Sequence, residues 1–205
     1  MANIKLTKNE QKNQRDRLKQ FERYLPTLQL KKQQLQSVIT QIEADLDTRK
    51  GELKELIAGL ESWVAVFSEN TIFPEDLKIE KLVQPDKVVA ENENIAGVNI
   101  PVFRELTFKE IVYDVADYPL WVDAALVRLR EIARLDAIVK TLETQVELLD
   151  KELRTTSQRV NLFERVKIPE AKENIKRIGI YLGDQQTSAV VRGKIAKKKT
   201  QEVAE

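Results

Sequence analysis

The feature that most constrains this chain is an apolar repeat between residues 18 and 67. Apolar side chains recur there at alternating steps of three and four residues, and only Lys32 and Arg49 interrupt them. This spacing lets a helix keep one stripe against a partner helix while both supercoil, and short globular helices seldom hold it so long. This first seam comprises Leu18, Phe21, Leu25, Leu28, Lys32, Leu35, Ile39, Ile42, Leu46, Arg49, Leu53, Leu56, Leu60, Trp63 and Phe67. It predicts a long helix that needs a partner.

A second seam later in the chain supplies that partner. Its members are Ala125, Arg128, Ile132, Leu135, Val139, Leu142, Val146, Leu149, Leu153, Thr156, Val160 and Phe163. Because the two seams lie on either side of one intervening segment, the simplest closure is an antiparallel hairpin. Burying about twenty seam side chains at about 1.5 kcal/mol each outweighs exposed ion pairs, which contribute about 0.5 kcal/mol each. The seams therefore determine the predicted fold.

The predicted fold class is mainly α, a long antiparallel two-helix coiled-coil hairpin with a small middle region that contains a β-hairpin and a short helix. A charged fraction of 33% with only 6% aromatic residues suits long solvated helices better than a thick globular core. We predict an N-terminal long helix within 1–67, a middle region at 68–119, a C-terminal long helix within 120–199 and a disordered tail at 200–205.

Local signals refine the helices. Thr7 and Glu10 have capping-box spacing, which predicts a helix start near Lys8, and Pro26 predicts a bend inside that helix. Near Pro169 the apolar set resumes one residue late, which predicts a local change of winding. We expect a register that sets Pro26 opposite Pro169, so that both helices bend at one level.

In the expected register, Leu46 faces Leu149 and Leu53 faces Leu142. The competing register is shifted by one heptad and places Lys32 opposite Thr156, which pairs two polar exceptions to the seams.

The middle region has strand-like spacing. Residues 87–91 and 98–103 read as two short strands separated by a turn-rich stretch, and 106–118 has helical spacing. Pro101 has no N–H to donate, so its strand should be an edge strand or be bulged. Two strands alone are marginal in water, so we expect the hairpin to pack on the helices or on a partner protein.

The residues for most catalytic chemistry are missing. The chain has no cysteine and no histidine, and its six glycines form no phosphate-binding loop. Its carboxylates read as solvated helix faces. We therefore expect no catalytic residue, no metal, no cofactor and no enzymatic activity of its own. The chain opens with neither a signal peptide nor a transmembrane run, so we expect an intracellular protein.

Charge is distributed unevenly although the net charge is only +1. Residues 1–34 carry nine Lys or Arg against three acids, residues 69–117 carry eleven acids against five bases, and residues 192–199 carry five bases and no acid. The predicted hairpin would be basic at its open end and acidic at its closed end, a polarity that steers different partners to each end. The lysines at 197–199 have no interleaved aromatics, so we do not expect nucleic-acid binding.

Several stretches resemble a known family. Residues 4–10 (IKLTKNE), 24–28 (YLPTL) and 30–35 (LKKQQL) resemble the amino-terminal helix of the D subunit of the rotary V/A-type ATPases and ATP synthases. Residues 94–101 (NIAGVNIP) resemble that family's β-hairpin region, and 159–164 (RVNLFE) followed by 168–169 (IP) resemble its carboxy-terminal helix. The resemblance covers nearly the whole chain in the right order.

The resemblance implies a central-stalk rotor subunit, a coiled-coil axle that transmits rotation between a catalytic hexamer and a membrane ion-translocating ring. The implied partners are the F subunit of the central stalk, the catalytic and non-catalytic subunits of the A/B hexamer, and a membrane-rotor adaptor subunit, in a cytoplasmic complex peripheral to the membrane. The residues expected to face the hexamer are Lys8, Lys12, Arg15, Arg192, Lys194 and Lys197. Those expected to face the stalk partners are Val98, Ile100, Val102 and Phe103.

Two other functions fit a long helical hairpin. A non-rotary scaffold or tether would use it to space two partners without turning. An RNA-binding coiled-coil arm would carry basic residues along its length, whereas here they gather at one end.

Overall fold

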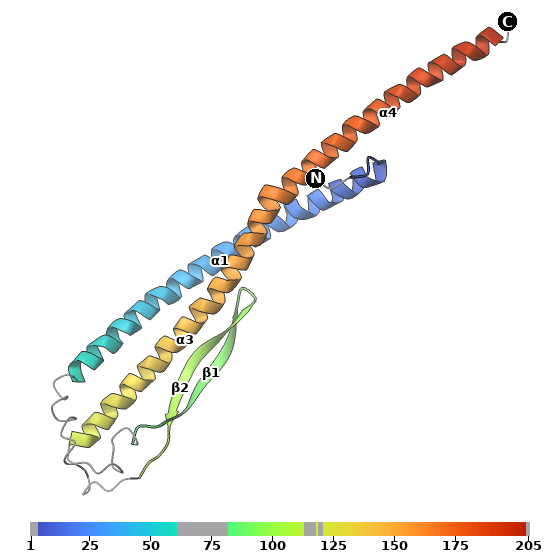
Figure 1. The fold of residues 1–205 in the computed structure, drawn as a ribbon. Helices are drawn as coiled ribbons and strands as arrows, with labels where there is room; N and C mark the ends of the chain where they lie inside the picture. Colours follow the sequence, from blue (N-terminus) through green and yellow to red (C-terminus); the bar gives the residue numbers. More distant parts are fainter. Residues whose placement is uncertain (1–3, 61–81, 113–117, 119–120, 204–205) are drawn as a thin grey trace. The chain divides into compact units, whose positions relative to one another are not determined.

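The computed structural model describes residues 4–60, 82–112, 118 and 121–203. The elements are α1 (Lys8–Leu60), β1 (Pro85–Ile95), β2 (Val98–Phe108), α3 (Trp121–Leu162), a π-helical turn (Phe163–Lys167) and α4 (Ile168–Val203) (Figure 1). Long helices with one antiparallel β-hairpin between them confirm the predicted fold class. The chain divides into two units, residues 1–32 with 155–205 and residues 33–154, and each is described by itself below.

The start of α1 is set by the predicted cap. The backbone N–H of Glu10 donates to Thr7 Oγ1 at 3.3 Å, and the N–H of Gln11 donates to the Thr7 carbonyl as the first helical bond. The Glu10 carboxylate accepts a hydrogen bond from the side chain of Gln14 at 2.8 Å. The helix starts at Lys8 as predicted and continues through Pro26. Its expected extension to Phe67 lies outside the described residues.

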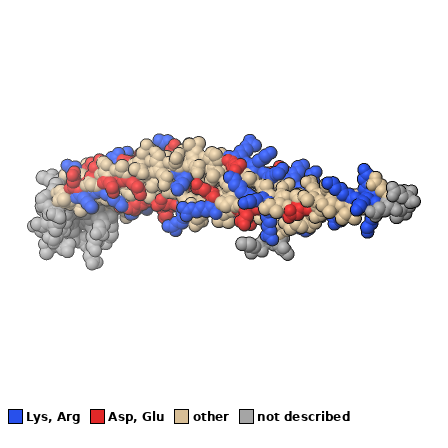
Figure 2. All heavy atoms as spheres, turned by 90° about the horizontal axis from the view of Figure 1, so that it is seen from above, with Lys and Arg blue, Asp and Glu red and all other residues tan. Residues whose placement is uncertain are grey.

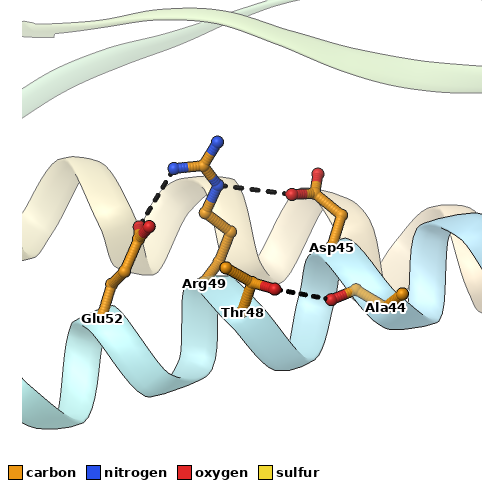
Figure 3. A network of polar contacts seen from close by, with 5 residues as sticks. All are labelled: Ala44, Asp45, Thr48, Arg49 and Glu52. Atoms are coloured by element: carbon orange, nitrogen blue, oxygen red, sulfur yellow. Dashed lines mark hydrogen bonds and ion pairs between the residues drawn. The ribbon is translucent and has the colours of Figure 1, made fainter.

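Arg49, which interrupts the first seam, is neutralised by its own helix. Its guanidinium lies 3.0 Å from the carboxylate of Glu52 and 3.5 Å from that of Asp45 (Figure 3). The hydrogen bond to Glu52 contributes most to raising the pKa of Arg49, and the charges of Glu52 and Asp45 add to it. The seam therefore tolerates a cation here because two acids one turn away compensate its charge.

In the unit of residues 33–154, the hairpin packs on both helices. One buried cluster joins Leu35 and Ile39 of α1, Leu149 of α3 and Ile100 of β2. Partly buried apolar residues surround it: Val38, Ile42, Ile95, Ala96, Val98 and Leu153. An exposed ion pair between Lys50 and Glu143 also links α1 to α3, at 2.7 Å. The helices cover the turn end of the hairpin and part of β2, which adds the burial that two strands alone lack, whereas β1 is exposed from Pro85 to Asn94.

The hairpin is longer than the sequence predicted. β1 pairs antiparallel with β2 from Pro85 opposite Phe108 to Ile95 opposite Val98, with irregularities next to Asp86 and Arg104. Both strands are edges of the two-stranded sheet, as expected for the strand that holds Pro101. The helix predicted over 106–118 is wrong in part, because residues 106–108 belong to β2 and 109–112 are not helical; residues 113–117 lie outside the described residues.

The hairpin turn uses two residues with positive φ, Ala96 at 51° and Gly97 at 82°. Such a turn matches the right-handed twist of the strands, and it normally takes Asn or Gly at both positions. The side chain of Asn94 supports the turn, because its Oδ1 accepts the N–H of Gly97 at 3.0 Å and its amide donates to Asn99 at 2.6 Å. Ala96 adopts the strained conformation and packs its methyl against the buried cluster.

A second cluster covers the start of α3. Leu82, Val122 and Leu126 are buried there, with Val83, Ile111, Tyr118 and Trp121 packed around them. The predicted seam is confirmed at Ala125, which is fully buried, and is wrong at Arg128, which is exposed; Val122 and Leu126, outside the seam, are buried as well. At the start of α3 this local apolar cluster buries residues that the predicted seam did not include.

In the unit of residues 1–32 with 155–205, α1 packs against the end of α3, the π-helical turn and α4. The rings of Phe21 and Phe163 lie 5.2 Å apart between centroids, and Lys172 Nζ lies 3.3 Å from the Glu22 carboxylate. The buried residues from the later helices are Thr156, Val160, Ala171 and Ile178. The π-helical turn falls where the sequence predicted a change of winding. Residues 200–203, expected in a disordered tail, are part of α4.

Candidate interaction surfaces

The basic residues predicted as an interaction surface are exposed. Lys8, Lys12 and Arg15 point to solvent from the first two turns of α1. Those from the later part of the chain, Arg192, Lys194 and Lys197, are exposed on α4. Figure 2 shows Lys and Arg side chains gathered toward the C-terminal end of α4 on the face in view. No described acid forms an ion pair with any of these six residues, so their charges are available to an external partner.

The end of α4 has little contact with the rest of the chain. Leu182 is its last partly buried residue, and every side chain from 183 to 201 is exposed. A groove formed with Lys8 and Gln11 of α1 reaches along α4 only to Ala189. Most of this last stretch, called the α4 tip below (residues 183–201), is therefore a helix without a described partner helix.

The α4 tip also exposes apolar side chains that sequence reasoning missed. Val190, Val191 and Ile195 keep 60%, 49% and 52% of their surface exposed. A mixed surface of basic and apolar side chains on one helix suits a protein partner better than a nucleic-acid backbone, which is recognised chiefly through phosphates. The signal that could have revealed it is the recurrence of β-branched residues in a stretch without a facing seam.

The hairpin residues predicted to face partners divide into two groups. Ile100 is 2% exposed and is part of the buried cluster with α1 and α3, and Val98 packs against that cluster. Val102 and Phe103 are half-buried. The structure therefore directs Ile100 toward the chain's own helices, and the other side chains keep partial access to solvent. Val88 and Val89 of β1, which were not predicted, are 47% and 38% exposed.

A polar contact fixes the hairpin on α3. The buried side-chain amide of Gln145 donates a hydrogen bond to the carbonyl of Pro101 in β2. On the exposed side, the Arg104 guanidinium lies 2.7 Å from the Glu91 carboxylate across the two strands. The hairpin is thus held at a defined position on the helices, and its outer face is presented in one orientation.

Two charged groups have shifted pKa values with local causes. The pKa of Glu10 is lowered from 4.5, chiefly by the hydrogen bond from Gln14. The pKa of Lys140 is raised, chiefly by its hydrogen bond to Asp136, whose carboxylate lies 2.6 Å away. Both arise from contacts within one helix, so neither marks a catalytic acid or base.

The part of the chain that the structure describes shows no cluster of metal-binding side chains and no helix that could cross a membrane. No three acidic side chains come together there in a way that would hold a metal ion. None of the described helices is both long and apolar enough to cross a membrane. The candidate functional features are therefore surfaces: the basic residues of α1, the α4 tip and the outer face of the hairpin.

Comparison with known proteins identifies the family of this chain. The family model for the ATP synthase D subunit matches residues 10–198. The V-type ATP synthase D subunit of Borreliella burgdorferi is 50% identical over 197 residues, covering 96% of this chain and 95% of the relative. The V-type ATP synthase D subunits of Chlamydia abortus and Chlamydia trachomatis serovar L2 are 34% and 31% identical, each over 98% of this chain and over 95% and 98% of their own lengths. The chain therefore belongs to the ATP synthase D subunit family.

Proposed function

We propose that this chain is the central-stalk rotor subunit of a V/A-type ATP synthase or ATPase. It transmits rotation between the catalytic hexamer and the membrane ion-translocating ring and does no chemistry itself. Its relatives are named as D subunits of V-type ATP synthases. The observation that carries the proposal is the α4 tip, a long helical stretch with basic and apolar side chains exposed on a chain that otherwise packs helix against helix.

An axle has physical requirements that this chain meets. It must resist unwinding, and the buried seam residues Leu35 and Leu149 hold α1 against α3 in one cluster. It must also engage partners without locking to one of them. Exposed charges favour fast, reorientable contacts, because their attraction acts over several ångströms and is screened by salt.

The proposed partners follow the distribution of surfaces. The A/B hexamer would receive the α4 tip and the start of α1, with Lys8, Lys12, Arg15, Arg192, Lys194 and Lys197 facing it. The F subunit of the central stalk and the membrane-rotor adaptor would contact the part of the chain that carries the hairpin, through Val102, Phe103 and the exposed part of Val98, whereas Ile100 is buried against the chain's own helices. In this arrangement the protein is cytoplasmic and peripheral to the membrane.

A reversible cross-link separates a rotor from a static scaffold. Because the chain has no native cysteine, Lys194→Cys introduces a single thiol on the α4 tip. The purified complex carries a second cysteine on a facing hexamer subunit, and gentle oxidation joins the two. If the chain rotates, ATP turnover stops on oxidation and returns on reduction, because the cross-link blocks rotation.

The matched control is the Lys194→Cys complex without the hexamer cysteine, which must stay active in the same oxidant. Full turnover in the cross-linked complex would refute the rotor function and favour the scaffold. Measurable ATP hydrolysis by the highly purified chain alone would refute its non-catalytic role.

A further inference from the structure

The π-helical turn at residues 163–167 adds one residue to the long helix made by α3 and α4. The backbone N–H of Ile168 bonds to the carbonyl of Phe163, five residues back, where an α-helix would bond four residues back. Alternating steps from Val160 through Phe163 would next reach Lys167 and then residue 170. The residue buried is instead Ala171. The extra residue accounts for this slip of one position.

A proline removes one backbone hydrogen bond from each of the two facing helices, α4 and α1, at this level. Pro169 has no N–H, so the carbonyl of residue 165 lacks its α-helical donor, and Pro26 likewise cannot donate to the carbonyl of Glu22. The contact between Phe21 and Phe163 sets these two interruptions beside each other. The Lys172 ion pair with Glu22 crosses between the helices in the same region.

Apart from the partly buried Phe163, which contacts Phe21, side-chain packing compensates little for this loss. No residue of the π-helical turn is buried, and Leu162 and Val166 keep 44% and 48% of their surface exposed. Segments with few buried contacts and interrupted backbone bonds have the lowest local stability in a structure. Kinks and changes of winding in long helices concentrate at such places.

We propose that Phe163–Lys167, together with Pro26 and Pro169, forms a segment of low torsional stiffness. Under torque the helix pair twists more in this segment than elsewhere. The extra residue supplies compliance and is not needed for folding. This inference rests on the proposed rotor function, because only a shaft under torque uses torsional compliance.

The first test asks whether the extra residue is dispensable for folding. Deletion of the exposed Arg165 should convert the π-helical turn to an α-turn and keep Ala171 and Ile178 on the buried stripe. The full-length variant should melt within about 4 °C of the wild type or above it. The matched control is deletion of the exposed Glu147, which rotates Leu149 out of the cluster and should lower Tm by about 10 °C or more.

The second test measures compliance in the assembled complex. A bead is attached through Glu93→Cys, an exposed position of β1, the hexamer is fixed, and the angular fluctuation of the bead is recorded during the pauses of rotation. The Arg165 deletion should reduce the angular variance, because an α-turn is stiffer than the turn it replaces. Each pause angle should remain as in the wild type.

Two results would overturn the inference. Loss of stability on Arg165 deletion as large as that of the Glu147 control would show that the turn is required for folding. An unchanged angular variance in a stable variant would show that the turn contributes no compliance. Failure of the rotor function itself gives a different result, since the wild-type complex would then hydrolyse ATP without bead rotation.

Discussion

The side-chain amide of Gln145 on α3 donates a hydrogen bond to the carbonyl of Pro101 in β2, 44 residues earlier in the chain. Gln145 is one of three buried polar residues in the part of the chain that the structure describes. Pro101 lies within the continuous strand β2, opposite Asn92, and its carbonyl needs a donor where it is covered by α3. The glutamine supplies that donor and so determines where the hairpin sits on the helix.

Replacing Gln145 with Leu should leave the Pro101 carbonyl buried without a partner. We expect a loss of about 1–3 kcal/mol in the free energy of unfolding, the typical cost of such a group. Chemical denaturation measures it, and hydrogen exchange should show faster opening of β1 and β2. The matched control is Gln158→Leu at an exposed position of α3, which should change stability little. Equal effects of both variants would contradict the anchoring role.

The two glycine-to-alanine changes Gly97→Ala and Gly51→Ala should act in opposite directions. Gly97 has a φ of 82°, a conformation that costs an alanine about 1–2 kcal/mol, so the change should destabilise the hairpin. Gly51 lies inside α1 with open space where a Cβ would stand, so alanine should stabilise the helix by about 0.5–1 kcal/mol. Thermal unfolding of both variants measures the difference, and the same sign for both would contradict these backbone assignments.

Stability should fall in acid partly through Glu10. Its pKa is lowered in the folded state, so its contribution is fully present above the unfolded value of 4.5 and is lost as the pH falls through the folded value. Glu10→Gln should therefore flatten the acid limb of a stability-versus-pH curve. Glu55→Gln, at an exposed acid of the same helix, is the control. A carboxyl NMR titration of Glu10 that shows no downward shift would contradict the mechanism.

Paired cysteines should determine the register of α1 against α3. We expect Leu46→Cys to form a disulfide with Leu149→Cys in preference to Leu142→Cys, because a heptad of slip is about 10 Å and a disulfide spans Cα atoms only 4.4–6.8 Å apart. The buried cluster includes Ile42 with Leu153, which this register pairs, and Ile39 with Leu149, which the alternative pairs. Gel mobility after gentle oxidation distinguishes them, and preferential closure with Leu142→Cys would establish the alternative.

The long helices could be predicted because their signals are local and repeated. The Thr7 cap, the start at Lys8 and most of the buried stripe follow from spacing alone. The change of winding near Pro169 was visible as a one-residue slip, although only the backbone shows that a π-helical turn absorbs it. Periodicity failed at Leu106 and Phe108, which belong to β2. These two residues are two positions apart, which fits a strand, whereas the apolar residues that follow them in the sequence have helical spacing.

The surfaces were harder to predict than the helices. The apolar face of the hairpin was recognised, but alternation cannot tell whether a face is covered by the same chain or by a partner. Ile100 is covered by α1 and α3. The polar run at 92–94 suggested a turn, yet it belongs to β1, because this edge strand is exposed over nearly all of its length and so accepts consecutive polar residues. The six basic residues expected to face the hexamer are exposed, which charges without a partner usually are, and the surface that they would contact stays a prediction.

The exposed end of α4 has a consequence for how assembly energies should be interpreted. Beyond the groove that ends at Ala189, the helix is held mainly by its own backbone bonds, and Gly193 weakens those further. Whatever binds residues 183–201 must also suppress their fraying. The binding free energy measured for this end therefore equals the free energy of the contacts minus the cost of the conformational entropy lost when the helix becomes ordered. A partner that encloses these residues would complete the folding of the chain.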